Sequence, residues 1–263
     1  MSEPPHTVIG MDPSPARPSE SRFPSERSGS TAGSPEWTRV VGVFDLETTG
    51  VDVTHDRIVT AHVGVLDADG AVLSARDWLA DPGVAIPEGA TAVHGITTAH
   101  ARTHGRRAVE VVAEVVDAIR GILDAGIPVV AYNAPYDFSL LKHEALRHGV
   151  DPITEPSPVI DPLVVDKAYD RWRRGKRTLT VVAEHYAVRL DGAHEASADA
   201  IAAGRVAQAL AVRYAPWLPQ SAEALHTQQI GWARAQAASL TEYFISIGRL
   251  DPEEHLDGSW PIR

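Results

Sequence analysis

The chain has 263 residues, of which 44% are hydrophobic and 22% are charged, a composition typical of a globular protein with one substantial core. It has no cysteine, which excludes disulfides and thiolate metal sites and fits a reducing cytoplasm. The formal net charge of −11 argues against a protein that coats nucleic acid nonspecifically, although it leaves room for carboxylates that bind divalent cations. The sequence has neither an apolar run near the roughly 18 residues of a membrane span nor the basic-then-apolar order of a secretory signal, so we expect a soluble cytoplasmic protein with no membrane contact.

Residues 1–37 are rich in proline, serine and glycine and have no periodic apolar pattern. Such a segment cannot bury enough surface to offset its ordering entropy, so we predict a disordered tail, within which Met1 and Met11 are both candidate start residues. The remainder is predicted to form one domain over residues 38–215 and a helical extension over residues 216–263.

The predicted domain begins with three strands. Residues 40–44 form a β-branched apolar run typical of a buried central strand. Residues 58–66 and 71–79 are predicted as two further strands, and the turn-forming residues 67–70 between them indicate a hairpin.

Helices and short strands then alternate. After a connection rich in proline and glycine, the spacing of apolar residues predicts a helix, a strand, a helix, a strand and three more helices, at residues 109–123, 127–132, 135–148, 157–160, 162–169, 178–186 and around 202–210. This order predicts an α/β fold with a mixed sheet of about five strands flanked by helices, antiparallel at first and parallel later.

Two carboxylates stand at the end of the first strand. Asp45 and Glu47 are two residues apart, so they point to the same face of the strand. They would repel one another at an apolar strand end unless cations lie between them, and Gly50 allows a turn that leaves room for a ligand. A strand that simply runs into a solvated loop explains this motif alone equally well.

A third carboxylate follows the strand predicted at residues 127–132. Asn133 can cap the next helix and Pro135 suits its first turn, which places Asp137 near the positive end of the helix. Taken alone, Asp137 is better explained as a residue that complements the helix dipole.

The third motif is a histidine followed by an aspartate. His194 is predicted in a loop, and Asp199 in the first part of the next helix, so that both can face one cleft. Taken singly, a loop histidine is more often a surface residue than a catalyst.

Together, the order of strand-end Asp-x-Glu, helix-start Asp and His-x₄-Asp resembles the DEDD exonuclease superfamily. Over about residues 38–215 the chain resembles its h subtype, the DnaQ-like group that includes the proofreading epsilon subunit of bacterial DNA polymerase III. The h form has histidine five residues before the last aspartate, as His194 is, whereas the y form has tyrosine four residues before it, where this chain has Glu195. The segments 93–96 and 176–179 and Asp161 also match. Tyr132 and Tyr136 depart from the histidine and phenylalanine of many proofreading members.

The resemblance implies a ribonuclease H-like fold and a metal-dependent 3′→5′ exonuclease that releases nucleoside 5′-monophosphates. Two divalent ions about 3.5–4 Å apart can activate water and stabilise the departing oxygen, and carboxylate oxygens suit Mg²⁺ or Mn²⁺. The ligands would be Asp45, the likeliest bridge between the ions, with Glu47, Asp137 and Asp199. His194 would be the general base, since imidazole titrates near neutral pH.

Substrate contacts are predicted at two places. By family likeness, the terminal nucleotide would be held by Thr48, His94, Asn133 and Tyr136. The basic run at residues 171–177 adds Trp172, Arg173 and Arg174, which suit stacking and phosphate neutralisation, although a solvated loop between two helices is the plainer alternative. The expected partners are 3′ ends of single-stranded DNA or RNA, with DNA favoured.

Residues 216–263 lie beyond the resemblance. Apolar residues recur at helical spacing between Ala233 and Ile247, which predicts an amphipathic helix that packs back on the domain, with Trp260 and Pro261 pinning the terminus. The alternative is a docking helix for a polymerase, a second subunit or another copy. Two functional alternatives also stay open: a proofreading subunit bound to a DNA polymerase, serving replication or repair, and a noncatalytic adaptor.

Overall fold

The computed structural model describes residues 33–190 and 192–263, and residues 33–263 form one compact unit. A short 3₁₀ helix, η1 (Glu36–Thr38), precedes the first strand, and Trp37 within it is buried, with its indole Nε1 donating to the carbonyl of Pro219 at 3.2 Å. The tail predicted at residues 1–37 therefore extends too far, since it includes η1. A single buried tryptophan leaves no periodic pattern that would mark the start of the folded part. Residues 1–32, including the candidate start Met11, lie outside the described residues.

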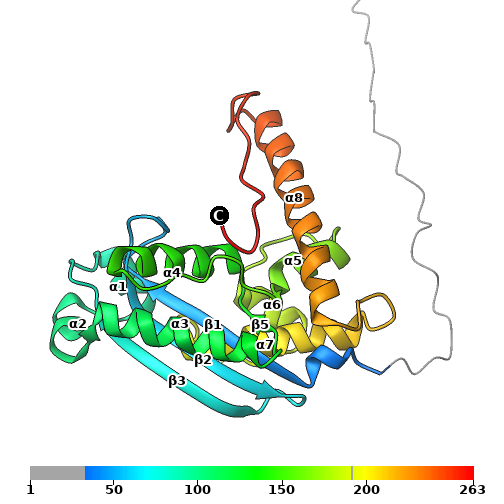
Figure 1. Cartoon of the computed structure of the whole chain (residues 1–263). Helices are drawn as coiled ribbons and strands as arrows, with labels where there is room; N and C mark the ends of the chain where they lie inside the picture. The colour runs from blue at the N-terminus through cyan, green and yellow to red at the C-terminus, as the bar shows by residue number, and fades with distance from the viewer. Residues whose placement is uncertain (1–32, 191) are drawn as a thin grey trace, which may run out of the picture. The chain divides into compact units, whose positions relative to one another are not determined.

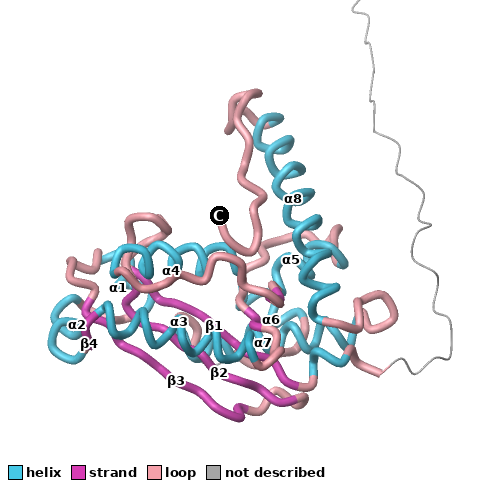
Figure 2. Tube along the Cα trace, viewed as in Figure 1, coloured by secondary structure: helices cyan, strands magenta, loops and turns pink. Residues whose placement is uncertain are grey.

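The strands form one mixed sheet in the order β4-β3-β2-β1-β5-β6 (Figure 2). β1, β2 and β3 pair antiparallel, whereas β5 lies parallel to β1, and β6 parallel to β5. The predicted mixed α/β sheet is confirmed. It has six strands rather than five, because the two-residue edge strand β4, parallel to β3, is too short to leave a pattern. The bounds are β1 (Val40–Thr48), β2 (Ile58–Asp67), β3 (Val72–Asp81), β4 (Arg106–Arg107), β5 (Val129–Val130) and β6 (Val159–Ile160).

Eight α-helices lie along the described residues. Two of these helices, each seven residues long, follow β3, where a connection rich in proline and glycine is predicted. They were missed because they are short and bury almost no apolar side chains, so they show no helical periodicity. The helices are α1 (Glu88–His94), α2 (Thr98–His104), α3 (Ala108–Asp124), α4 (Ala134–His148), α5 (Pro162–Tyr169), α6 (Leu179–His185), α7 (Ala196–Arg213) and α8 (Ala222–Ser246).

The helices cover both faces of the sheet, and the alternation of β1 decides which residue meets which helix. Phe44 belongs to the core cluster formed with α3 and α4, whereas Val43 belongs to the cluster formed with α5, α6 and α7 (Figure 1). Gly204 lets α7 approach closely, since a Cβ there would lie 2.5 Å from a methyl group of Val43. Because side chains alternate along a strand, Asp45 and Glu47 emerge on the face that α7 covers.

The C-terminal extension packs on the far edge of the sheet. The first part of α8 lies against β6 and α5, its distal half extends away from them, and the chain then returns toward α4 (Figure 1). Trp260, near the C-terminus, is buried among the residues of the α3 and α4 core. Within the described residues, no helix has the length and apolar character needed to cross a membrane.

Candidate active site

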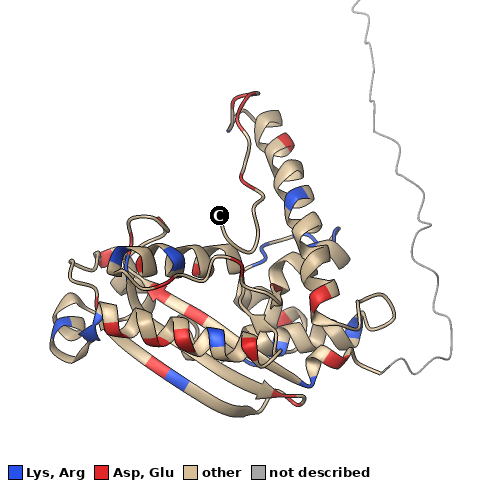
Figure 3. Cartoon of the chain, viewed as in Figure 1, with Lys and Arg blue, Asp and Glu red and all other residues tan. Residues whose placement is uncertain are grey.

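Three of the four predicted carboxylates meet at the end of β1. Asp45 and Glu47 are half-buried, and Asp199 approaches them from the first turn of α7. One carboxylate oxygen from each residue lies within 4.8 Å of the others. The second half of β1 stands out as an acidic stretch in Figure 3. The arrangement follows from strand alternation and from the close approach of α7, and it can hold a cation.

Asp137 reaches the same strand from α4 but makes a different contact. Its buried carboxylate accepts a hydrogen bond from the backbone N–H of Leu46 at 3.1 Å. β5 pairs with β1 only at Gly42 and Val43, so the later amide of Leu46 lies beyond the end of β5, where the first turn of α4 begins. Asp137 is thus next to Asp45 electrostatically without belonging to the group of three.

The electrostatics of the four carboxylates are unfavourable for their charged forms. Burial, followed by repulsion from Asp137, Glu47 and Asp199, raises the pKa of Asp45 well above its ordinary value, and burial likewise raises the pKa of Asp137 and of Asp199. Burial and the charge of Asp199 raise the pKa of Glu47 to about 7. A cation placed between these carboxylates would favour their charged forms.

The fit of this site to a hard cation can be tested on its polar atoms. The buried Oδ1 of Asp199 has no hydrogen-bond partner among the described residues, and no ion pair within that part of the chain involves any of the four carboxylates. Buried polar atoms are normally paired, and carboxylate oxygens are the ligands that Mg²⁺ and Mn²⁺ prefer. The residues therefore fit a divalent metal ion.

His194 lies in the exposed loop that leads into α7. Its backbone has a positive φ of 71°, and its N–H donates to Oδ2 of Asp199 at 3.3 Å. The residue lines a cavity of about 370 Å³, together with Glu47 and His94. The structure thus brings three predicted residues of different roles to one cavity.

The cavity also has walls that sequence reasoning missed. Asp77, on β3, lines it, and its Oδ1 accepts a hydrogen bond from Nδ1 of the buried imidazole of His62 at 2.7 Å. His62 pairs with Asp45 across β1 and β2, and with Asp77 across β2 and β3. The three residues therefore form one row across the sheet. The alternation of side chains along β2 and β3 indicates this row only when the registers of the strands are known.

Two of the residues predicted to hold the terminal nucleotide, Thr48 and Tyr136, are hydrogen bonded to one another. The hydroxyls of Thr48 and Tyr136 are hydrogen bonded, and each also contacts the carbonyl of Gly50, at 2.6 and 2.7 Å respectively. His94 accepts from the backbone N–H of Ile96 through Nδ1 at 3.1 Å, and its buried Nε2 has no partner among the described residues. Because Nδ1 accepts a hydrogen bond, a neutral ring carries its proton on Nε2, and burial lowers the pKa of His94.

Asn133 occupies the N-cap position of α4 but makes no side-chain cap hydrogen bond, and its φ is 64°. The cap comes instead from Asp161, whose two carboxylate oxygens accept from the backbone N–H groups of Asn133 and Ala134, both at 3.0 Å. The predicted capping by Asn133 is therefore wrong, because a carboxylate distant in the sequence reaches the helix first.

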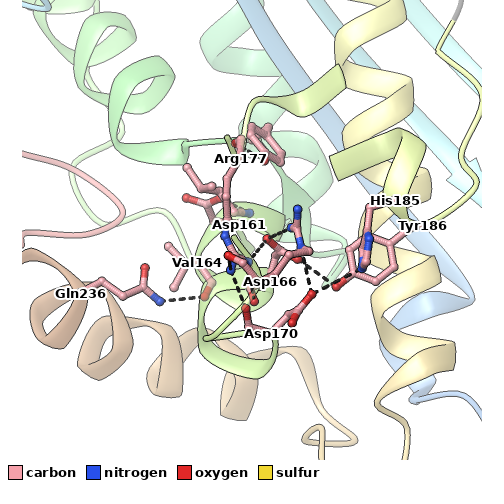
Figure 4. A network of polar contacts seen from close by, with 11 residues as sticks. Asp161, Val164, Asp166, Asp170, Arg177, His185, Tyr186 and Gln236 are labelled. Carbon is pink, nitrogen blue, oxygen red and sulfur yellow. Dashed lines mark hydrogen bonds and ion pairs between the residues drawn. The ribbon is translucent and has the colours of Figure 1, made fainter. Parts of the chain in front are cut away.

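The basic run at residues 171–177 is divided between two roles. Arg173 and Arg177 both bind the fully buried carboxylate of Asp166, and Arg173 also binds Asp170 (Figure 4 shows this network). Arg173, predicted to contact the substrate, is thus held within the loop by two carboxylates. Trp172, by contrast, is 77% exposed, and Arg174 is exposed as well.

The four carboxylates and His194 lie within the part of the chain that matches a known family. The model of a family described as exonuclease matches residues 43–207, and the chain belongs to this exonuclease family. The match lies inside the predicted domain at residues 38–215. The DnaQ-like resemblance read from the motifs and the ribonuclease H-like fold are both confirmed.

Particular relatives agree with that assignment. The chain is 32% identical over 168 residues to the PolC-type DNA polymerase III of Lacticaseibacillus paracasei, which covers 64% of the chain and 11% of the polymerase. It is 34% identical over 125 residues to a DNA polymerase III subunit epsilon-like protein of Rhodobacter capsulatus, which covers 47% of the chain and 16% of the relative. The chain thus spans a small part of these relatives.

Solved structures of the same fold include exonuclease I. The structure of E. coli exonuclease I with a dT13 oligonucleotide superimposes with a TM-score of 0.56 at 19% identity, covering 67% of this chain and 42% of that one. Another exonuclease I structure gives a TM-score of 0.59 at 20% identity, covering 74% and 44%. At these identities the likeness establishes the fold.

Proposed function

We propose that this protein is a metal-dependent 3′→5′ exonuclease that hydrolyses single-stranded nucleic acid, preferably DNA, to nucleoside 5′-monophosphates. The observation that carries the proposal is the convergence of Asp45, Glu47 and Asp199 within 4.8 Å, beside a buried oxygen without a partner, in a chain of the exonuclease family. The complex of exonuclease I with dT13 supports a single-stranded DNA substrate. We expect the protein to act in the cytoplasm, where DNA ends and Mg²⁺ are both present.

The four carboxylates would hold two Mg²⁺ or Mn²⁺ ions. When bound, such a pair activates a water and stabilises the departing 3′-oxygen in an in-line displacement. Glu47 and Asp199 belong to one side of the site with Asp45, and Asp137 lies on its other side, toward β5. Asp45 interacts electrostatically with Asp137 as well as with Glu47 and Asp199, so it would be the ligand that the two ions share.

His194 is proposed as the general base. The loop that carries it is tied to Asp199 through the backbone hydrogen bond, and the residue lines the same cavity as Glu47. A neutral ring can take the proton of the attacking water and release it to solvent through the exposed side of the loop.

The substrate would be held from two directions. The Nε2–H of His94 can donate to a phosphate or sugar oxygen in the shared cavity. The paired hydroxyls of Thr48 and Tyr136 provide a polar wall near the carboxylates, and Asn133 follows from the start of α4. Farther out, Trp172 can stack on a base and Arg174 can neutralise a phosphate.

A second candidate function is proofreading within a polymerase assembly. The observation that favours it is the identity of the relatives, which are DNA polymerase III proteins. Gel filtration of the chain with the polymerase of its own host would separate the two candidates. Co-elution at micromolar concentration supports the subunit, and separate elution supports a free-standing enzyme.

The decisive experiment uses oligonucleotides labelled at the 3′ or the 5′ end. Incubation with Mg²⁺ or Mn²⁺ should shorten the strand stepwise from the 3′ end, and EDTA should stop it. Asp45→Asn is the matched inactive control, because it keeps the shape of the side chain and removes its charge. A wild-type protein inert with every metal would leave only the adaptor alternative, and loss of 5′ label first would reverse the direction. Matched DNA and RNA strands then give the preference.

A further inference from the structure

We infer that the C-terminal segment, which lies outside the family match, contains positioning residues for the active site: Gln229 and Trp260 fix Asp161, and Asp161 fixes the start of the helix that carries Asp137. The inference rests on the proposed function, in which Asp137 is a metal ligand. It assigns the extension a part in catalysis without contact to substrate.

First, the backbone of β6, at the outer edge of the sheet, is held by side chains of α8. Among the residues that the structure describes, β6 is the last strand of the sheet, and its free backbone groups are paired by side chains of α8. Val159 donates its N–H to Nδ1 of His226 at 3.0 Å, and its carbonyl accepts from Nε2 of Gln229 at 3.0 Å. Oε1 of the fully buried Gln229 accepts from the N–H of Asp161 at 2.7 Å. One glutamine thus replaces a neighbouring strand, using its donor and its acceptor at once.

The second step is the carboxylate of Asp161. It accepts the first two free N–H groups of α4, from Asn133 and Ala134, and it also caps α5 by accepting from Leu163 at 2.9 Å. The indole Nε1 of Trp260 lies 3.4 Å from its Oδ2. Asp161 is labelled in Figure 4, beside α5. Its backbone is therefore held by α8, and its side chain by the C-terminal tryptophan.

The third step is the direct contact of the C-terminus with α4. The backbone N–H of Arg263 donates to Oγ of the fully buried Ser139 at 2.9 Å. The ring of Trp260 packs at 4.9 Å from that of His226. The start of α4 is thus held by its carboxylate cap and by a strap of chain that ends on its second turn.

The consequence for the site follows from the place of Asp137 in the first turn of α4. Its carboxylate bonds Leu46 of β1, next to Asp45, so a shift of the helix start moves it relative to the other carboxylates. Residues that orient metal ligands from outside typically change metal affinity or activity by about 10–100-fold when removed. The same scale is expected here from side chains distant in the sequence.

The test compares Gln229→Leu and Trp260→Phe with a matched control, Gln236→Leu. Gln236 lies on the same helix and donates to the carbonyl of Val164 at 2.9 Å, so it has the same chemistry without the connection to Asp161. Hydrogen exchange of the Leu46 and Ala134 amides, followed by NMR, reports the positioning without any need for activity. The Mn²⁺ concentration for half-maximal cleavage and kcat report its effect on catalysis.

Gln229→Leu is expected to speed exchange of both amides and to raise the Mn²⁺ requirement by about 10-fold or more, and Trp260→Phe is expected to do the same more weakly. Gln236→Leu should leave both unchanged at a similar loss of thermal stability. Wild-type exchange of both amides in a folded Gln229→Leu overturns the inference. If that variant does not fold, Trp260→Phe decides by the same criterion. A wild-type protein without nuclease activity would refute the proposed function, while the amide exchange would still decide whether Asp137 is positioned from the C-terminus.

Discussion

Two groups of carboxylates in this molecule differ in the partners that surround them. Asp166 is fully buried, and two guanidinium groups and the hydroxyl of Tyr186 surround it (Figure 4). The carboxylates at the end of β1 have no such partners among the described residues, and burial with mutual repulsion raises the pKa of Asp45 and of Glu47. The chain thus compensates the Asp166 carboxylate with its own cations, and, in the part that the structure describes, it leaves the proposed metal ligands at the end of β1 without them.

This difference predicts opposite results for the same kind of substitution. Removing one member of a compensated buried group leaves unpaired charge behind and destabilises the protein. Removing one member of a group that repels itself relieves the repulsion. Stability and activity should therefore separate cleanly between the two sites.

The largest expected effect is on activity at the β1 site. Asp45→Asn should lower kcat on single-stranded DNA on the order of 10³-fold or more, since members of a catalytic group that acts as a unit are not replaceable. The melting temperature of the metal-free protein should stay equal or rise, because a repelling charge is lost. Cleavage assays and calorimetry in EDTA measure the two effects, and an active variant would exclude Asp45 as a ligand.

The next effect is on stability at the compensated site. Asp166→Ala leaves Arg173, Arg177 and the hydroxyl of Tyr186 without their acceptor, so the free energy of unfolding should fall by about 3–5 kcal/mol. Urea denaturation measures it, and the folded fraction at 25 °C should keep its nuclease activity. A loss below about 1 kcal/mol would mean that solvent already screens this network as it screens a surface ion pair.

Much of this contrast was predictable from the sequence. Strand alternation placed Asp45 and Glu47 on one face, and the three motifs in order predicted the family, while the assignment of Asp137 and Asp199 as ligands stays a prediction. What could not be predicted is which side chains pair once the chain folds back: Asp166 is only seven residues from Arg173, yet no local pattern indicates that they bind, and nothing near Asn133 indicates that Asp161 caps the helix in its place. These contacts depend on how separate elements dock, and local patterns carry no information about docking.

The same limit applies to lengths. The strand predicted at residues 127–132 is only Val129–Val130 in the structure, and the early end of β5 is what opens the amide of Leu46 to Asp137. The helix predicted at residues 162–169 has the predicted bounds, because Asp161 and Pro162 form a start signal that is local.

A smaller effect, on thermal stability, follows from the raised pKa values. Burial raises the pKa of Glu47 from its ordinary 4.5 to about 7, so the folded state binds more protons than the unfolded state between these values, and stability falls as pH rises through that window. The metal-free melting temperature should therefore be lower at pH 8 than at pH 5 through this group, by about 3 °C for each kcal/mol lost in a domain of this size.

Mg²⁺ should reverse the trend, since a ligand that binds the ionised folded state stabilises it by mass action. The Mg²⁺-induced rise in melting temperature should be larger at pH 8 than at pH 5, and Asp166→Ala should show the same rise. Equal rises at both pH values would show that Mg²⁺ does not bind to these carboxylates.

The smallest effect distinguishes the outside of the loop at residues 171–177 from its inside. Trp172 is exposed, with the guanidinium of Arg171 5.1 Å from its ring centre, whereas Arg173 is enclosed by Asp166 and Asp170. Trp172→Ala should raise KM for an oligonucleotide about fivefold, the effect of losing about 1 kcal/mol of base stacking, with kcat and the melting temperature unchanged. Arg173→Ala should do the reverse, lowering the melting temperature and leaving KM nearly unchanged. If both variants raise KM alike, the buried arginine also reaches the strand, and the division of the basic run into support and contact fails.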